Sequence, residues 1–271
     1  MNALEKRMVD ALKDLKENHD VLGVKAEFEA EGTRMEEALR LKEVVTKAGL
    51  DLTIKIGGCE AIRDMYDARS IGVTRIVAPM IETPYALYKF IGATHMVYPD
   101  DEWETVDFLV NIETETGYRN FEDMLKLKES SQLAGVVLGR TDMSRSLGLT
   151  PDDINCDKVF DIASHLLPMA KRAGKECVIG GGVSADSVPF FGRLPQGCLD
   201  KFETRKVLFR YPGKDAATMC KGILKAVGFE LMWLKNKREF YGSIYQEDLQ
   251  RIKTLQSRYD KSIAAAGGKY E

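Results

Sequence analysis

Two carboxylates stand where the sequence predicts the ends of neighbouring strands. Glu113 directly follows the apolar run 108–112, and Asp142 lies just past the run 135–139. Neighbouring parallel strands end at the same edge of a sheet, so we expect these side chains to lie close together. Carboxylates, waters and a substrate carbonyl oxygen together suit octahedral Mg²⁺ or Mn²⁺. The residues alone leave a plainer alternative, in which Glu113 caps a helix and Asp142 makes an Asx turn.

A lysine occupies another predicted strand end. Lys55 lies near the end of the run 52–56, just before Gly57 and Gly58. Its ammonium group is a compact cation that can neutralise an anion such as a carboxylate. A Schiff base with a carbonyl substrate is chemically open to a lysine, and a purely structural ion pair is the other alternative. We therefore treat Lys55 as a candidate for both substrate binding and catalysis.

The first predicted strand ends in a cluster of charges. Alternation along the run 21–28 puts Lys25, Glu27 and Glu29 on one side and apolar side chains on the other. The chain has only three histidines, and each lies away from the predicted strand ends. If the chain performs acid–base chemistry, carboxylates such as Glu27 and Glu29, or a metal-bound water, are therefore the candidates for it.

Residues around Asp142 could contact a substrate anion. Gly139 leaves its backbone open to close approach, and Arg140 and Ser144 carry donors for a carboxylate. Simple turn geometry is the alternative for the glycine. Arg205 precedes a late strand, which places it at the bottom of an all-parallel barrel and outside the expected site.

Short apolar runs alternate with helical patterns along most of the chain. This rhythm predicts a parallel sheet with helices outside it, and we expect a TIM (β/α)8-type barrel of class α/β. An open doubly wound sheet is the alternative, but no GxGxxG follows the first strand. An eighth strand is expected near 96–98 or in the glycine-rich region after 180. The seven clear strands are 21–28, 52–56, 74–79, 107–113, 135–139, 176–179 and 206–209.

Helices extend the barrel at both ends of the chain. Residues 3–17 have apolar side chains at helical spacing, and so do residues 215–236 and 246–264. The length of 271 residues suits one domain, 1–271, made of a barrel with an extra N-terminal helix and a C-terminal helical extension.

Composition narrows the class of partner and compartment. A net charge of −3 argues against nucleic acid or an anionic membrane as the main partner. The five cysteines form no CxxC pair, which favours a reducing, cytoplasmic setting over a disulfide scaffold. The first 20 residues are charged and amphipathic rather than a signal peptide, and no apolar run reaches the ~20 residues of a membrane span.

Three ordered motifs resemble the HpcH/HpaI aldolase/citrate lyase family, within the phosphoenolpyruvate/pyruvate superfamily of barrels. They are IVAPMIETPYAL (76–87), FLVNIETETG (108–117) and LAGVVLGRTDMSRSLGL (133–149). The resemblance runs from about residue 22 to 150. It implies that Glu113 and Asp142 hold a divalent metal and that the chain stabilises a pyruvate-type enolate.

Two positions depart from the pattern of that family. Lys55 stands where the family usually has a substrate-binding arginine, and Lys lacks the bidentate fork of Arg. The run 23–32 lacks the histidine that serves acid–base catalysis in the family's metal-dependent aldolases.

The resemblance implies a metal-dependent carbon–carbon lyase or aldolase acting on a small 2-oxo acid or related carboxylate. An acyl-CoA lyase of the malyl-CoA, citramalyl-CoA or citrate lyase beta type is the first alternative. The second, from the missing histidine, is a non-catalytic metal-binding barrel that serves as a scaffold subunit. A homo-oligomer is also expected, with the C-terminal helix on a neighbouring barrel; the sequence leaves open that this helix covers its own barrel.

Overall fold

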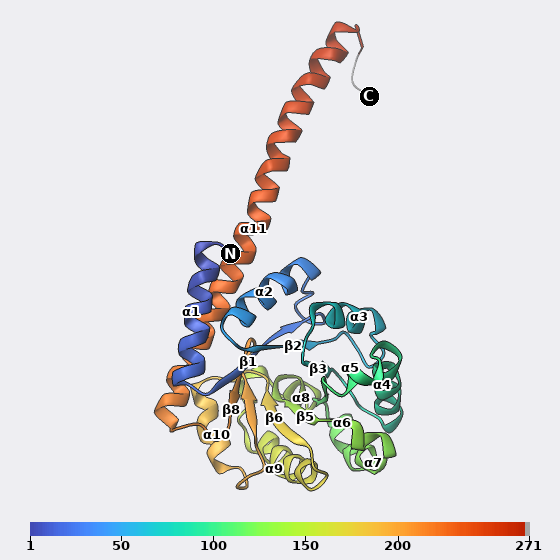
Figure 1. Ribbon diagram of the computed structural model, residues 1–271, viewed down its shortest axis with the longest axis vertical. Coiled ribbons are helices and arrows are strands. Elements are labelled where there is room, and N and C mark those ends of the chain that lie inside the picture. The colour runs from blue at the N-terminus through green and yellow to red at the C-terminus, as the bar shows by residue number, and fades with distance from the viewer. Residues whose placement is uncertain (269–271) are drawn as a thin grey trace. The chain divides into compact units, whose positions relative to one another are not determined.

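Eight strands close into a barrel in the computed structural model, which describes residues 1–268 (Figure 1). Each strand pairs with the next in chain order, and β8 pairs with β1 to complete the closure. The expected (β/α)8-type barrel is therefore confirmed. The strands are β1 Val21–Glu27, β2 Asp51–Lys55, β3 Arg75–Ala78, β4 Asp107–Ile112, β5 Gly135–Gly139, β6 Glu176–Gly180, β7 Lys201–Glu203 and β8 Val207–Arg210.

Helices surround these strands on the outside of the barrel (Figure 1). The expected N-terminal helix is present as α1, which begins with a capping box between Asn2 and Glu5. The helices of the barrel are α1 Ala3–Asn18, α2 Met35–Lys47, α3 Ile62–Ile71, α4 Pro84–Val97, α5 Asp100–Trp103, α6 Glu115–Arg119, α7 Phe121–Lys126, α8 Arg140–Ser146, α9 Asp157–Arg172 and α10 Val188–Arg193. Three 3₁₀ turns, η1 Lys128–Gln132, η2 Pro151–Asp153 and η3 Ala185–Ser187, complete them.

The last strand corrects the expectation of an all-parallel sheet. The pairs from β1–β2 to β6–β7 are parallel, but β8 runs antiparallel to both β7 and β1. The missing eighth strand is β7, only three residues long, in the region after 180; the other candidate, 96–98, lies at the end of α4. Because β7 and β8 are joined by a short turn, β8 starts at the end of the barrel where the parallel strands finish.

The barrel interior has an apolar middle between two polar ends. Alternation turns every second side chain of a strand toward the barrel interior. Buried inward side chains form a single hydrophobic cluster across the middle of the barrel. This apolar layer consists of Val77, Leu109, Val137, Val178 and Leu208. The next inward positions along the same strands lie at the two mouths of the barrel.

The chain divides by its contacts into two units, residues 1–230 and the segment from Leu231 onward. The barrel belongs to the first unit. The second unit is helical, because α11 runs without interruption from Ala216 to Ala265. The two separate helices expected at 215–236 and 246–264 are thus one, since Tyr241, Gly242 and Ser243 between them stay helical.

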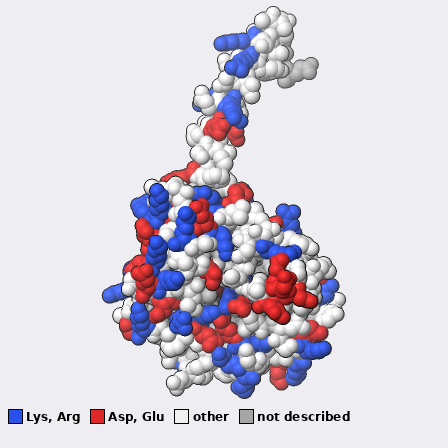
Figure 2. Space-filling view, in the orientation of Figure 1, with Lys and Arg blue, Asp and Glu red and all other residues white. Residues whose placement is uncertain are grey.

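Acidic and basic side chains are interspersed over the barrel surface shown in Figure 2, and no broad basic patch stands out on that face of the described residues. No helix among the described residues is long and apolar enough to cross a membrane.

Candidate active site

A cavity of about 730 Å³ lies at the C-terminal ends of the parallel strands. Six carboxylates and four basic side chains contribute to its lining, which leaves an excess of two negative charges when all are ionised. The carboxylates are Glu27, Glu29, Glu113, Asp142, Glu203 and Glu230, and the basic residues are Lys25, Lys55, Arg145 and Arg205.

Lys55 sits between two of these carboxylates. As the last residue of β2, it places Nζ 3.1 Å from Glu29 Oε2 and 3.4 Å from Glu113 Oε2. Burial alone would lower the pKa of Lys55, but the charges of Glu113 and Glu29 outweigh it and raise this pKa. The site therefore holds a buried ammonium group that stays charged at neutral pH.

Glu113 is held from three sides. Its Oε1 accepts the backbone N–H of Met80 at 3.0 Å, and its Oε2 accepts Nδ2 of Asn111 at 2.7 Å in addition to the contact with Lys55. Burial raises the pKa of Glu113 by more than Lys55, Asn111 and Met80 lower it. A Cβ at Gly139 would lie 2.6 Å from Glu113 Oε2, so this position of β5 requires the glycine.

A second buried lysine makes a similar cluster on β1. Lys25 Nζ lies 2.5 Å from Glu203 Oε1 and 3.1 Å from Glu27 Oε1. Burial opposes the charge, but Glu203 and Glu27 raise the pKa of Lys25, and Lys25 in turn lowers the pKa of Glu27 against its burial. Glu203 packs over Gly180 much as Glu113 packs over Gly139. Sequence reasoning placed Lys25 on the correct side of its strand but missed Glu203.

The turn between β7 and β8 brings Arg205 to this cavity, which corrects its expected place at the bottom of the barrel. Because β8 is antiparallel, residues that precede it lie at the same mouth as the ends of β1 to β6. Arg205 Nε lies 3.2 Å from Glu31 Oε1, and the buried Lys206 pairs with the same carboxylate. The sequence carries no clear local signal for this turn, because β7 has only three residues.

Asp142 lies in the first turn of α8 and lines the cavity with Glu113. It is partly exposed, and its only ion pair in the described chain is with Arg145, at 3.7 Å. The buried Oδ1 of Asn111, on the same wall, has no hydrogen-bond partner. No group of three or more His, Cys, Asp or Glu side chains among the described residues is arranged to hold a metal. A metal here would need Glu113 and Asp142 with other oxygen donors.

The structure places Arg140 and Ser144 outside the cavity. Arg140 is fully buried, where its guanidinium donates to the carbonyl oxygens of Gly180 and Gly181, to Asn155 and to Ser187. Burial lowers the pKa of Arg140 to about 10. Ser144 is also fully buried, in α8. Arg140 thus ties β5 to the end of β6, and neither residue is positioned to contact a substrate anion.

The three histidines also lie away from the cavity lining. His19 contacts the carbonyl oxygen of Thr218 at 3.0 Å, His95 contacts Gln132, and His165 contacts the hydroxyl of Tyr118. Acid–base chemistry in this cavity therefore depends on its carboxylates, lysines and bound water.

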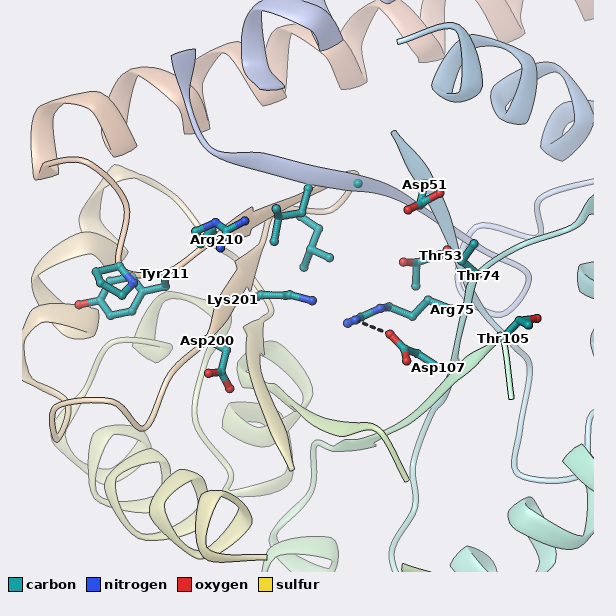
Figure 3. Close-up of a pocket in the computed structure, with 14 residues that line it drawn as sticks. Asp51, Thr53, Thr74, Arg75, Thr105, Asp107, Asp200, Lys201, Arg210 and Tyr211 are labelled. Atoms are coloured by element: carbon teal, nitrogen blue, oxygen red, sulfur yellow. Dashed lines mark hydrogen bonds and ion pairs between the residues drawn. The ribbon is translucent and has the colours of Figure 1, made fainter. Parts of the chain in front are cut away.

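A second cavity, of about 720 Å³, lies at the opposite mouth of the barrel. Figure 3 shows Arg75 and Lys201 reaching toward its middle from opposite walls. Both are already paired: Arg75 with Asp107 at 2.8 Å and with Glu176 at 2.5 Å, and Lys201 with Glu176 at 2.5 Å. The charges of this mouth mostly satisfy one another, so the first cavity is the better candidate for a site.

The sequence matches the HpcH/HpaI aldolase/citrate lyase family over residues 33–186. The chain belongs to this family. The match confirms the resemblance seen in the three motifs, and it places the chain in a family of aldolases and citrate lyases. No functionally curated protein matches the sequence.

Solved structures with the same fold include the citrate synthase SbnG, at 16% identity and a TM-score of 0.60 over 86% of this chain and 90% of that chain. An HpcH/HpaI aldolase/citrate lyase family protein from Burkholderia cenocepacia is 16% identical, with a TM-score of 0.58 over 90% of this chain and 100% of that chain. An HpcH/HpaI aldolase from Desulfitobacterium hafniense is 14% identical, with a TM-score of 0.55 over 68% of this chain and 77% of that chain. At sequence identities this low, the similarity between this chain and these structures shows a shared fold and not a shared activity.

The matched range covers only part of the cavity. Lys55, Gly139, Glu113 and Asp142 fall inside it. The cluster on β1 and the turn between β7 and β8 fall outside it. The family match therefore says nothing about the two cavity walls that carry Lys25 and Arg205.

Proposed function

We propose that this chain is a metal-dependent carbon–carbon lyase or aldolase that acts on a small 2-oxo acid through its enolate. The observation that carries the proposal is the buried ammonium group of Lys55 beside Glu113, 3.4 Å apart, at a strand-end cavity of a barrel in this family. A fixed buried cation next to an acidic group is suited to an anionic substrate whose charge shifts during reaction.

The residues present fit a divalent cation. Glu113 and Asp142 supply carboxylate oxygens, the unpartnered Oδ1 of Asn111 faces the same wall, and the lining carries two negative charges in excess. Hard oxygen donors of this kind suit Mg²⁺ or Mn²⁺. When bound, such an ion would polarise the carbonyl and carboxylate oxygens of a 2-oxo acid as a Lewis acid.

Lys55 supplies the second positive charge of the proposed site. Its pKa is raised, so it stays an ammonium group and cannot serve as a base at neutral pH. It is therefore expected to bind the substrate carboxylate and to stabilise the negative charge that grows on the enolate oxygen. The missing Cβ at Gly139 leaves room for the Glu113 carboxylate itself, which keeps this carboxylate at the cavity wall beside Lys55.

Glu29 is the proposed general base. The side chain of Glu29 is 28% exposed, against 9% for the other candidate, Glu27. Its Oε2 lies 3.1 Å from Lys55 Nζ. Glu27 is held ionised by Lys25, which lowers its pKa and makes it the weaker base. In the condensation direction, Glu29 takes a proton from the methyl carbon of the 2-oxo acid. The resulting enolate carbon bonds to an aldehyde carbon, and the new alkoxide oxygen takes up a proton from the protonated Glu29, directly or through water, which returns Glu29 to its carboxylate form.

The test is hydrogen–deuterium exchange at the methyl group of pyruvate in D₂O, followed by NMR. We expect exchange that needs Mg²⁺ or Mn²⁺, stops with a chelator and returns when the metal is restored. Glu113→Gln should remain folded and lose both metal binding and exchange. Full exchange by metal-stripped protein would contradict the proposed metal dependence.

A panel of second substrates then separates the related functions. Turnover of pyruvate with aldehydes supports the aldolase, whereas cleavage of malyl- or citramalyl-type thioesters without it favours an acyl-CoA lyase. Metal binding with neither exchange nor turnover on the panel favours a scaffold subunit.

A further inference from the structure

The second unit carries an apolar stripe along one side of α11. From Leu231 onward, side chains recur at alternating steps of three and four residues, the heptad spacing of a helix that packs along another helix. The positions of this stripe, which we call the seam, are Leu231, Leu234, Arg238, Tyr241, Tyr245, Asp248, Ile252, Leu255 and Tyr259.

The seam is exposed in the single chain. Leu231, Leu234, Ile252 and Leu255 are each more than half exposed, with values of 51%, 52%, 60% and 62%. Leu231 to Leu255 spans about 36 Å at the ordinary rise of an α-helix. Large exposed apolar side chains repeated at this spacing mark an interaction site, and long helices depend on packing for most of their stability.

Two charged residues interrupt the seam, and they define its partner. Arg238 and Asp248 are exposed, and neither has an ion-pair partner among the described residues. Their positions are symmetric about residue 243. If a second copy of the helix lies antiparallel with its own residue 243 opposite, Arg238 meets Asp248 of the second copy and Asp248 meets Arg238.

The same alignment matches every other seam position. Leu231 meets Leu255 of the second copy, Leu234 meets Ile252, and Tyr241 meets Tyr245. Beside the two-fold axis, Ile244 lies next to its own symmetry mate. One like-charge flank, Lys237 beside Arg251 of the second copy, opposes pairing only at the solvent-facing margin.

We infer that the helix from Leu231 to Leu255 pairs with a second copy of itself, antiparallel and about a two-fold axis near Ser243. A two-fold interface requires a surface that is complementary to itself, which this seam is in both apolar and charged positions. Parallel, in-register pairing would set Arg238 against Arg238 and Asp248 against Asp248, which is unfavourable in a helical seam.

The charge test uses sedimentation equilibrium on the full chain. Arg238→Asp and Asp248→Arg should each raise the dimer dissociation constant about tenfold or more, because each creates two like-charge contacts. Arg238→Asp combined with Asp248→Arg should restore it. Lys253→Asp, an exposed change off the seam, is the matched control and should leave the constant close to that of the wild type.

Cross-linking tests the direction of pairing. Ile244→Cys should form a disulfide with its own copy, and Leu255→Cys should not, with the wild type as the control for native cysteines. A monomer at all concentrations, or a dimer whose stability ignores the seam variants, would overturn the proposal. Cross-linking of Leu255→Cys but not of Ile244→Cys would overturn the antiparallel arrangement.

Discussion

The two mouths of the barrel are alike in size and unlike in how their charges are used. At the bottom, three basic and three acidic side chains line the cavity, and Arg75 closes on Asp107 and Glu176. At the top, six carboxylates meet four basic groups, and buried lysines hold the carboxylates in place. The apolar layer separates the two ends. Both mouths are highly charged, and the difference on which the proposed site rests is the excess of two negative charges at the top.

Glu113→Gln should give the largest difference between the mouths. Removing this carboxylate leaves Lys55 with one acidic partner and removes a proposed metal ligand, so we expect the rate of pyruvate exchange to fall by about 10³. Glu176→Gln at the bottom is the matched change and should leave the rate within a small factor. Equal losses in the two variants would show that the mouths do not differ in function.

Lys55→Met should lower the rate by about 10², because no cation then balances the enolate. Lys55→Arg keeps the charge and should retain most of the activity. The measurement is kcat and KM for exchange, with thermal unfolding as the check on folding. If Lys55→Met were fully active, Lys55 would be a structural ion-pair partner only.

Two glycines at opposite ends of β5 offer a matched pair. Gly139→Ala puts a Cβ against Glu113, and Gly135→Ala puts one 2.6 Å from the carbonyl oxygen of Glu176. Gly139→Ala should lower the rate of exchange about tenfold through the displaced carboxylate, whereas Gly135→Ala should cost about 1–3 kcal/mol of stability and spare activity. Urea unfolding and exchange rates measured on both variants decide this.

The smallest effect concerns the pH dependence of the bottom mouth. Burial raises the pKa of Glu176, but Arg75 and Lys201 outweigh it and lower this pKa below its usual 4.5. The interaction therefore adds stability above that value and loses it as pH falls through the lowered pKa. Glu176→Gln should be about 1–2 kcal/mol less stable than wild type at pH 7, with a smaller gap at pH 3. A gap that does not shrink in acid would point to lost packing instead.

Much of the first unit could be predicted from the sequence because its strands are apolar and regularly spaced. Alternation alone put Asn111 and Glu113 on the side of Leu109, which faces the barrel interior. Lys55 was expected at a strand end for the same reason, and it is the last residue of β2.

What the sequence could not give is set by long-range pairing. β7 has only three residues, too few to show a pattern, so the reversal of β8 and the place of Arg205 were misjudged. Arg140 was expected to bind an anion. Its burial against Phe190 and Phe191 could not be foreseen, because these residues lie about 50 positions away in the sequence, on α10. The pairing of Lys25 with Glu203 joins residues 178 positions apart and leaves no local trace.

The reversed strand also gives the rim of the proposed active site a turn unlike the other loops around it. Loops after the parallel strands β1 to β6 of this barrel lead into helices. The turn that contains Arg205 is anchored on both sides by strands of the same sheet. Residues inserted there would extend over the cavity without moving any helix, which makes this turn the natural place to graft new substrate specificity.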